Sequence, residues 1–496
     1  MSRPSSFLYT PAAVREIDRI AIEEVGIPGF ELMSRAGRLV WDTARARHPA
    51  ARHWLVLCGA GNNAGDGYIV AALARAAGVD VTVAALADPH GLRGDAARAW
   101  EQYQRSGGAV LPFSAGLCAA ADLIIDALLG TGAARPLEGA WLHAVQAVNE
   151  SGVPVVAVDL PSGLDGTTGQ PLGVAVRAGA TVTFIGRKLG LYLGAGPEHA
   201  GDIVFGDLGV PAGRVAHVTP QLRLFDADDQ RRWLPRRSRT AHKGDFGHVL
   251  VVGGNSGMGG AARLAGEAAL RAGAGLVSVV TRPENVPAIL AGRPELMCRG
   301  VSDPAELDVL FERATLIAVG PGLGHDAWAR QLWARVLDQH QPLVVDADAL
   351  NLLAGQPRQR EDWVLTPHPG EAARLLGTTT AAVQQDRVRA AAELGARFGG
   401  IILLKGRGSL IGRAGDLPYL IDAGNPGMAS GGMGDVLTGL VAGIAAQHRP
   451  ADLPGAAACA AFVHASAADE AARAGERGLV AGDLFGPLRR WLNPAN

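Results

Sequence analysis

The stretch Asn425-Pro-Gly-Met-Ala-Ser-Gly-Gly-Met-Gly-Asp-Val-Leu-Thr-Gly439 places three glycines and then a carboxylate where an apolar run begins. This pattern predicts a helix that starts within the glycine-rich segment. Backbone N–H groups at Gly431, Gly432 and Gly434 can converge on an anion, and the helix dipole adds partial positive charge there. Asp435 stands beside them and can accept a proton. The segment therefore predicts phosphoryl transfer to a hydroxyl group.

The overall composition indicates two folded domains. At 496 residues the chain is too long for one ordinary core, so we expect one domain over residues 1–215 and a second over residues 216–496. The formal charge of -2 argues against nucleic acid or an anionic membrane as a partner. Four scattered cysteines fit a reducing compartment, and no apolar run reaches the roughly 18 residues that a membrane helix needs. We expect a cytoplasmic protein and a homo-oligomer, whose size the apolar pattern does not define.

Apolar runs alternate with amphipathic stretches along both halves of the chain. This rhythm predicts mostly parallel sheets with helices on both faces, so the fold class is α/β with two doubly wound three-layer domains. The two halves show no obvious internal repeat, which favours a fusion of unlike enzymes. Strands are expected at 53–58, 79–86, 122–129, 153–160, 180–185 and 202–205, then at 248–253, 276–281, 315–319, 342–346, 363–366, 401–405 and 409–411, and helices at 65–77, 95–105, 139–150 and 261–273.

Polar motifs in the second half follow the expected strands repeatedly. Ligands of open α/β sheets collect at the carboxyl ends of the strands, so these motifs together predict one shared site. Any one of them alone could be ordinary turn chemistry. Lysine is rare in the chain, and Lys405 lies in one of these motifs. This position favours a role for Lys405 that requires a compact ammonium group. The motifs are 320–324, 346–351, 366–371 and 405–409.

Three segments of the second half, 425–439, 366–371 and 242–247, resemble the ADP- or ATP-dependent NAD(P)H-hydrate dehydratases of the ribokinase-like superfamily. The resemblance spans about residues 230–490. It implies a ribokinase-like domain in which Asp435 deprotonates the acceptor hydroxyl and ADP brings a magnesium ion. The residues implied to face the hydrated nicotinamide are Ala261, Gly322, His368 and Asp435, and those implied to form the nucleotide pocket are Lys405, Gly406, Arg407, Gly408, Ser409 and Gly434.

Three motifs in the first half also follow expected strands, so their polar groups can meet at one edge of a sheet. Within them, Asn63, Asp126 and Ser162 offer oxygen ligands, which suit a hard cation rather than zinc. The alternative is that each motif only closes a turn between a strand and a helix through ordinary Asx and glycine geometry. The motifs are 62–67, 126–132 and 158–166.

These motifs closely resemble the NAD(P)H-hydrate epimerases over about residues 10–210. The resemblance implies a Rossmann-like domain in which Asn63, Asp126 and Ser162 hold potassium. It also points to Asp159 for acid–base work at C6 of the hydrate, with Lys188 as a candidate partner. Epimerases commonly carry a glycine where this chain has Ala64, and a methyl group is tolerated there if φ is negative. The residues implied to bind the hydrate are Asn62, Asn63, Ala64, Gly65, Asp66, Gly130, Thr131, Gly132, Ala133, Ala134, Arg135, Pro136 and Asp159.

Together the two resemblances predict a bifunctional enzyme of nicotinamide nucleotide repair. Its substrates would be ADP and the hydrates of NADH and NADPH. One domain would interconvert the R and S hydrates, and the other would dehydrate the S form to NAD(P)H while ADP gives AMP and phosphate. A kinase-like pocket aims one hydroxyl at one phosphorus, so only one epimer can react, and a second activity is needed to invert the other.

Two other functions fit part of the same pattern. A vitamin or sugar kinase fused to a ligand-binding domain explains Asp435 equally well, but it explains neither His368 nor the motif at 62–67. A non-catalytic nucleotide sensor would need no base at Asp435. The sequence leaves open the choice between ADP and ATP, and between the hydrates of NADH and NADPH.

Overall fold

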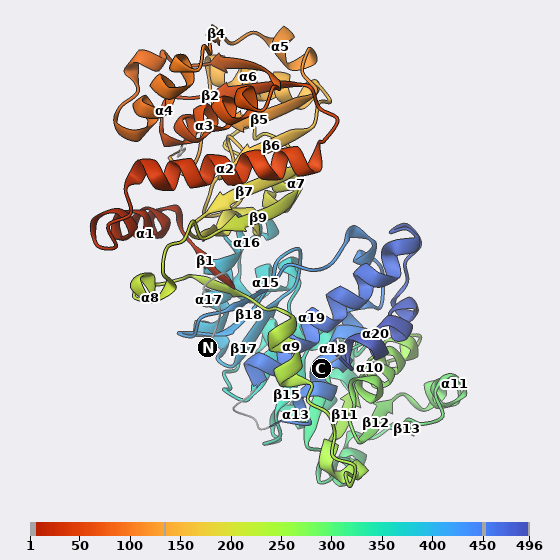
Figure 1. The fold of residues 1–496 in the computed structure, drawn as a ribbon. Coiled ribbons are helices and arrows are strands. Elements are labelled where there is room, and N and C mark those ends of the chain that lie inside the picture. Colours follow the sequence, from red (N-terminus) through yellow and green to blue (C-terminus); the bar gives the residue numbers. More distant parts are fainter. Residues whose placement is uncertain (1–5, 133–134, 449–452, 495–496) are drawn as a thin grey trace. The chain divides into compact units, whose positions relative to one another are not determined.

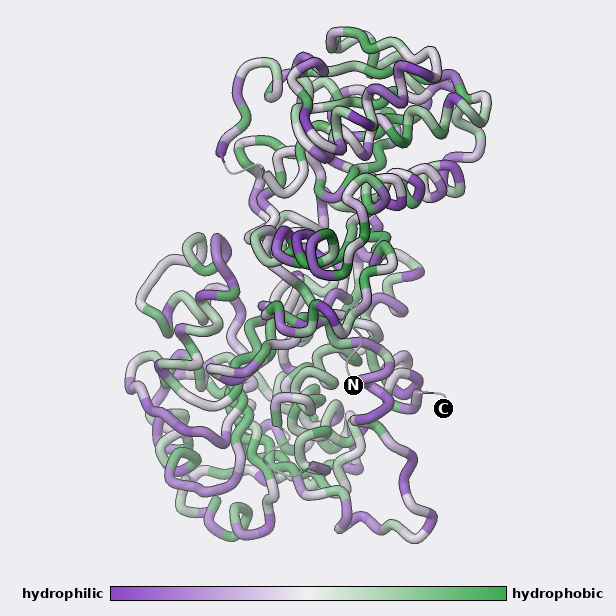
Figure 2. The backbone as a smooth tube through the Cα atoms, turned by 60° about the vertical axis from the view of Figure 1, so that its left-hand side comes forward, coloured by the Kyte–Doolittle hydropathy of each residue, from purple (hydrophilic) through white to green (hydrophobic). Residues whose placement is uncertain are grey.

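The computed structural model describes residues 6–132, 135–448 and 453–494 of the chain. The chain divides into two compact units after Leu222, and each is a doubly wound α/β domain, which confirms the predicted fold class (Figure 1). Within each unit, hydrophobic residues run along the central strands and hydrophilic residues gather in outer helices and loops (Figure 2). Across the described ranges, no helix combines the length and the apolar character needed to cross a membrane.

The N-terminal unit contains a sheet of seven parallel strands in the order β4-β3-β2-β5-β6-β7-β9. The chain winds outward in opposite directions from β2 and from β5. The loops after these two strands therefore diverge and leave a crevice at their carboxyl ends. The strands are β2 (His53–Cys58), β3 (Asp80–Ala85), β4 (Val110–Pro112), β5 (Leu123–Ala127), β6 (Val155–Val158), β7 (Ala180–Phe184) and β9 (Asp202–Gly206), and a separate short pair consists of β1 (Phe7–Tyr9) and β8 (Arg187–Lys188).

Helices cover both faces of this sheet, because successive strand residues point to opposite sides. Trp54 and Val56 of β2 face the cluster formed with α2, α3 and α4. Leu55 and Leu57 of the same strand face the cluster formed with α5 and α6. The helices are α1 (Pro11–Glu23), α2 (Gly29–Arg47), α3 (Asn62–Ala76), α4 (Gly94–Arg105), α5 (Ala115–Ala119), α6 (Gly139–Glu150), α7 (Gly196–Ala200) and α8 (Ala212–Val215).

The C-terminal unit has a longer sheet in the order β13-β12-β11-β14-β15-β16-β17-β18-β19-β10. Its strands are parallel from β13 to β17, and β18 is antiparallel to both of its neighbours. The parallel part places the loops after β14, β15, β16 and β17 at one edge. The strands are β10 (Leu222–Leu224), β11 (His248–Val252), β12 (Leu276–Thr281), β13 (Met297–Gly300), β14 (Leu316–Val319), β15 (Leu343–Val345), β16 (Trp363–Leu365), β17 (Ile401–Leu404), β18 (Ser409–Arg413) and β19 (Tyr419–Ile421).

One face of this sheet packs against α10, α18 and α19 through alternate strand residues such as Val249 and Val251. On the other face, α13 contacts β14 and α17 contacts β17. The helix α18 begins within the glycine-rich stretch, as predicted. The helices are α9 (Ala227–Trp233), α10 (Gly259–Ala272), α11 (Val286–Gly292), α12 (Asp308–Phe311), α13 (Ala327–Leu337), α14 (Ala347–Gly355), α15 (Pro369–Leu376), α16 (Thr380–Gln385), α17 (Arg387–Phe398), α18 (Met433–Ala445), α19 (Leu453–Ala471) and α20 (Phe485–Trp491).

Three strands of the C-terminal unit, β10, β13 and β19, were not predicted. Each has only three or four residues. No residue of β13 is fully buried, because this strand lies at the edge of the sheet. Such short segments do not produce an apolar run, so periodicity cannot identify them.

Candidate active sites

The N-terminal unit has a cavity of about 760 Å³ at the carboxyl ends of its central strands. The loops after β2 and β5, the first turn of α3, the residue after β6 and one face of α1 line it. The structure therefore brings together most residues that the epimerase resemblance implied. The predicted residues that line the cavity are Asn62, Asn63, Asp66, Gly130, Thr131, Gly132 and Asp159, whereas Ala64, Gly65, Arg135 and Pro136 do not line it, and Ala133 and Ala134 lie outside the described residues.

The segment 62–67 forms the first turns of α3, which begins at Asn62 and not at 65 as predicted. Its glycines permit close packing of this helix. A Cβ at Gly65 would lie 2.6 Å from Sδ of Met33, and a Cβ at Gly67 would lie 2.7 Å from Cβ of Ala127. The backbone of Ala64 is helical, so its methyl group causes no strain.

Asp159 follows β6 with a left-handed backbone, at φ 67°. Its carboxylate accepts a close hydrogen bond from Lys188 Nζ and one of 3.2 Å from Thr183 Oγ1. Lys188 Nζ also donates to Thr183 Oγ1 at 3.2 Å and to the carbonyl of Phe184 at 3.0 Å. The side chain of Lys188 is only 2% exposed, so this ion pair lies in a largely dry setting where its charges interact strongly.

Two other carboxyl groups that line the same cavity, those of Asp18 and Asp66, have raised pKa values. Burial raises the pKa of Asp18 to about 6, and the nearby charge of Asp159 adds to the increase while Lys188 opposes it. Burial also raises the pKa of Asp66 well above its usual value, with Asp159 and Asp18 adding to the effect. The cavity thus combines one ion pair with two carboxyl groups that favour the protonated form.

The three residues implied to hold potassium come from three elements. Asp126 is the next-to-last residue of β5 and accepts hydrogen bonds from Ser162 N at 2.8 Å and from Ser162 Oγ at 2.6 Å. Burial raises the pKa of Asp126 to about 6, although these bonds oppose the increase. Both polar atoms of the Asn63 amide are buried without a hydrogen-bond partner. A buried amide oxygen with no partner fits a site that a cation completes.

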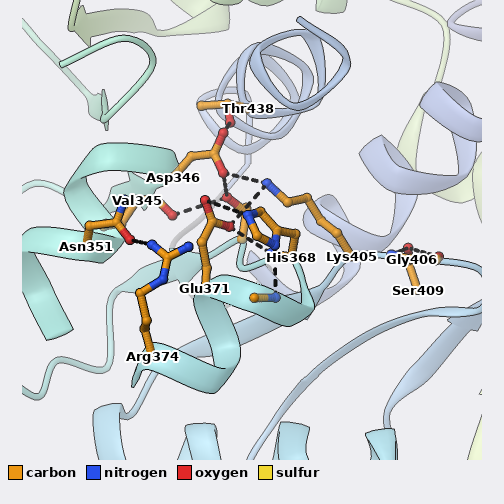
Figure 3. Close-up of polar contacts among 12 residues, drawn as sticks. Val345, Asp346, Asn351, His368, Glu371, Arg374, Lys405, Gly406, Ser409 and Thr438 are labelled. Atoms are coloured by element: carbon orange, nitrogen blue, oxygen red, sulfur yellow. Dashed lines mark hydrogen bonds and ion pairs between the residues drawn. The ribbon is translucent and has the colours of Figure 1, made fainter. Parts of the chain in front are cut away.

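In the C-terminal unit, Asp346 is the centre of a buried network at the ends of β15, β16 and β17 (Figure 3). Its Oδ1 accepts hydrogen bonds of 2.7 Å from both Lys405 Nζ and Thr366 Oγ1. Its Oδ2 accepts a bond of 2.7 Å from Thr438 Oγ1 of α18. Burial acts to raise the pKa of Asp346, but Lys405 and the two hydroxyls outweigh it and lower the pKa.

His368 and Glu371 form a capping box at the start of α15. Glu371 accepts a bond of 2.8 Å from the backbone N–H of His368, and its Oε2 lies 3.8 Å from Lys405 Nζ. His368 Nδ1 accepts from the N–H of Gly370 at 2.9 Å, which leaves Nε2 facing Glu371 Oε1 at 3.5 Å. Burial lowers the pKa of His368, so the neutral ring is favoured.

Asp435 lies in the first turn of α18 and is partly exposed. Burial raises its pKa to about 7, with the charge of Asp346 adding to the increase and Lys405 opposing it. The N-cap is Gly432 at φ 89°, and no side chain caps the helix there. The first N–H groups of α18 are therefore available to an anion beside a carboxyl group that titrates near neutral pH.

The other residues predicted for this unit lie around the same edge. Gly322 and Ala261 are neighbours, since a Cβ at Gly322 would lie 3.1 Å from Cβ of Ala261. Gly434 lies close to the ammonium group of Lys405, because a Cβ there would lie 3.5 Å from Nζ. In the turn after Lys405, Ser409 Oγ donates to the carbonyl of Gly406 at 2.9 Å. Within this turn, which also contains Gly408, Arg407 donates to the carbonyls of Asp422 and Gly424 at 3.1 and 3.0 Å.

Comparison with known proteins gives matches to both units. The NAD(P)H-hydrate dehydratase family matches residues 249–488, and the family described as YjeF-related protein N-terminus matches residues 29–190. A bifunctional NAD(P)H-hydrate repair enzyme Nnr from Coxiella burnetii is 46% identical, with 98% of this chain and 99% of that protein covered. The Escherichia coli enzyme of the same name is 44% identical, with 97% and 93% covered.

The chain belongs to the bifunctional NAD(P)H-hydrate repair enzymes.

Solved structures agree for the C-terminal unit of this repair enzyme. A ribokinase-like superfamily protein from Enterococcus faecalis has a TM-score of 0.52 at 33% identity, with 55% of this chain and 95% of that chain covered. The ADP/ATP-dependent NAD(P)H-hydrate dehydratase from Bacillus subtilis, co-crystallised with ATP and Mg²⁺, has a TM-score of 0.50 at 31% identity, with 54% and 97% covered. The predicted family and the predicted ribokinase-like fold are thus confirmed.

Sequence reasoning placed Asp346 and Thr438 in polar motifs without a specific role, and it did not identify Asp18. Asp346 and Thr438 meet although they are far apart in the chain, and a hydrogen bond between side chains leaves no local pattern. Asp18 reaches the cavity of the repair enzyme from α1, before the first glycine-rich motif. The one available signal for Asp18 is a carboxylate on the apolar face of an amphipathic helix, between Ile17 and Ala21.

Proposed function

We propose that the N-terminal unit interconverts the R and S hydrates of NADH and NADPH, and that the C-terminal unit dehydrates the S hydrate with ADP, giving AMP and phosphate. The observation that supports dehydration best is Asp435, a carboxyl group with a raised pKa beside the uncapped start of α18. We assign the first activity to residues 1–215 and the second to residues 216–496. We also propose a cytoplasmic homo-oligomer with no nucleic-acid or membrane partner.

The proposed dehydration begins with phosphoryl transfer. Asp435 takes the proton of the C6 hydroxyl while the oxygen of this hydroxyl attacks the terminal phosphorus of ADP, and AMP leaves. The free N–H groups at the start of α18, together with Lys405, stabilise charge on the moving phosphoryl group. The C6–O bond then breaks with phosphate as the leaving group, and loss of a proton from C5 restores the ring double bond. The predicted contacts to the hydrate are Ala261, Gly322 and His368.

A magnesium ion would be carried by the nucleotide in this scheme, as in the Bacillus subtilis relative crystallised with ATP and Mg²⁺. The carboxylate of Asp346 already accepts bonds from Lys405, Thr366 and Thr438, so the phosphates are the better ligands. The ion would neutralise phosphate charge. Residues 405–409 and Gly434 are our proposed nucleotide pocket, and ADP is our proposed physiological donor.

The proposed epimerase site uses Asp159 and Lys188 at the cavity, with potassium beside it. Asn63, Asp126 and Ser162 fit this ion because they offer oxygen donors and because the buried amide of Asn63 has no partner. Potassium would fix the loops after β2, β5 and β6, which carry the predicted contacts to the hydrate. No proton-transfer step requires the ion.

Replacing potassium by lithium should slow repair of the R hydrate and leave repair of the S hydrate unchanged, because only the N-terminal unit has the proposed ion site. Asn63→Ala should raise the potassium concentration needed for half-maximal epimerisation by about tenfold. The thermal midpoint of the N-terminal unit should also rise with potassium less in this variant than in the unchanged protein. Equal responses of the two proteins to potassium would contradict the assignment of Asn63.

Dehydration of the S hydrate should depend on pH through Asp435. A general base works in its ionised form, which predominates above its pKa of about 7. We therefore expect kcat/KM to increase with pH up to a plateau above pH 7 and to fall about tenfold for each unit below it. Initial rates of NADH formation from pure S hydrate across this range would measure the profile. A rate that increases toward acid would contradict a base at this position.

The proposal as a whole is tested by incubating the protein with a mixture of NADH hydrate epimers, potassium, magnesium and ADP. The absorbance of NADH should return completely, and parallel reactions with ATP would compare the two donors. Free phosphate should appear in equal amount with NADH. A stable phosphorylated product without NADH would instead support the kinase alternative.

A further inference from the structure

One carboxyl group in the N-terminal cavity has no part in the scheme above. Asp18 lies on α1 between Val14 and Ile22, and all three residues line the cavity. Their spacing of four places them on one face of the helix. Among the described residues, none forms a hydrogen bond or an ion pair with the side chain of Asp18. Its carboxyl group is therefore free to contact a bound molecule.

Two other carboxyl groups of the same cavity differ from Asp18 in their surroundings. Asp159 is paired with Lys188. Asp66 favours its protonated form well beyond the usual range of a carboxyl group, since burial raises its pKa. Asp18 has no such ion pair, and burial raises its pKa to about 6, which lies close to neutral pH. The charged residues that line the cavity are Arg15, Asp18, Asp66, Asp95, Asp159 and Lys188.

Inversion at C6 needs two proton-transfer groups that approach the ring from different sides. The hydroxyl must leave from one face and water must enter from the other, so a single group cannot serve both oxygen atoms. Asp159 reaches the cavity from the end of β6 and Lys188 reaches it from β8, whereas Asp18 reaches it from α1. Asp18 and the Asp159–Lys188 pair thus reach the cavity from different elements of the fold.

We propose that Asp18 is a second catalytic residue of the epimerase, acting on the C6 oxygen together with the Asp159–Lys188 pair. This inference rests on the proposed function of the N-terminal unit. In one direction, Asp18 gives its proton to the C6 hydroxyl as the C6–O bond breaks. The electron pair of the ring nitrogen forms the C6=N bond and water leaves. A water molecule then attacks the other face and gives its proton to Asp159. The reverse reaction follows the same steps backward, and the protons re-equilibrate with solvent.

Asp18→Asn should lower kcat for epimerisation of the R hydrate by about 100-fold and change KM little, because it removes proton transfer and keeps the shape of the side chain. In the unchanged protein, kcat/KM should fall above pH 6, because Asp18 loses the proton that it donates. This fall should disappear in the variant. Asp18→Glu retains a carboxyl group and should recover part of the rate. Asp42→Asn on the exposed surface of α2 is the matched control and should behave as the unchanged protein.

Repair of pure S hydrate by the same protein samples separates this inference from the proposed function. It should be equal in all four proteins. If the unchanged protein interconverts the epimers and Asp18→Asn does so with the same kcat and the same pH profile, the role of Asp18 is overturned. An increase of KM without a change in kcat would also overturn it, since that result would assign Asp18 to substrate binding and not to proton transfer. Failure of the unchanged protein to interconvert the epimers would instead refute the epimerase function. If Asp18→Asn does not fold, Asp18→Glu provides the test. The proposal is overturned if kcat/KM of this variant falls at the same alkaline pH as kcat/KM of the unchanged protein.

Discussion

Asp435→Asn is expected to abolish the return of NADH from both hydrate epimers. The R hydrate is affected as well because it must pass through the S form. Loss of a general base lowers kcat by about 10²- to 10⁴-fold, and the uncapped start of α18 cannot compensate because its N–H groups accept no proton. Epimerisation in the N-terminal unit should continue at its normal rate. Separation of the R and S hydrates by chromatography, alongside the absorbance of NADH, measures both activities in one sample.

The control for this change is Asp416→Asn, which removes a carboxylate from an exposed turn between β18 and β19. Its dehydration rate should equal that of the unchanged protein. ADP should still bind to Asp435→Asn, since this carboxyl group is assigned to the hydroxyl of the hydrate and not to the nucleotide. A nucleotide sensor without catalysis would behave differently, because Asp435→Asn would then leave its function intact.

Asp159→Asn is expected to slow repair of the R hydrate by about 10²- to 10⁴-fold and to leave repair of the S hydrate intact. The change removes the negative charge that pairs with the Lys188 ammonium group, whose side chain is 2% exposed. An unpaired buried charge costs roughly 3–5 kcal/mol of stability, so the N-terminal unit should also melt at a lower temperature. Rates with each pure epimer and a calorimetric scan measure the two effects.

The double variant Asp159→Asn with Lys188→Met distinguishes the loss of chemistry from the loss of stability. Removing both charges relieves the unpaired ammonium group, so much of the thermal stability should return. The epimerisation rate should remain low, because neither charged group is present. Equal loss of S-hydrate repair in these variants would contradict the division of the two activities between the units. Recovery of the epimerisation rate together with stability would refute a catalytic role for Asp159.

The sequence allowed prediction of the fold because hydrophobic periodicity reports burial directly. The strands at His53–Cys58 and Leu276–Thr281 were predicted to the residue, since apolar residues predominate in both. The start of α18 was also predicted, because glycines followed by an apolar run are a local signal. The start of α3 at Asn62 was missed by three residues, because glycine usually disfavours a helix and its benefit here lies in close packing against Met33 and Ala127.

Contacts between distant segments explain what the sequence did not reveal about the sites. The bond from Thr438 to Asp346 joins residues that are 92 positions apart. Asp18 approaches the cavity only because α1 packs there, and nothing near it in the sequence resembles a motif. The raised pKa values of Asp435 and Asp18 likewise follow from burial and from neighbouring charges, which are known only once the chain is folded.

The network around Asp346 has a consequence for the speed of the enzyme. Thr438 lies three residues after Asp435, so the bond from its hydroxyl to Asp346 prevents α18 from sliding along its axis. The sheet and the helix are locked at one point before any ligand arrives. The entropy lost in aligning the proposed base with the N–H groups proposed to bind the anion is therefore lost when the chain folds, and each turnover would begin from a site that is already assembled.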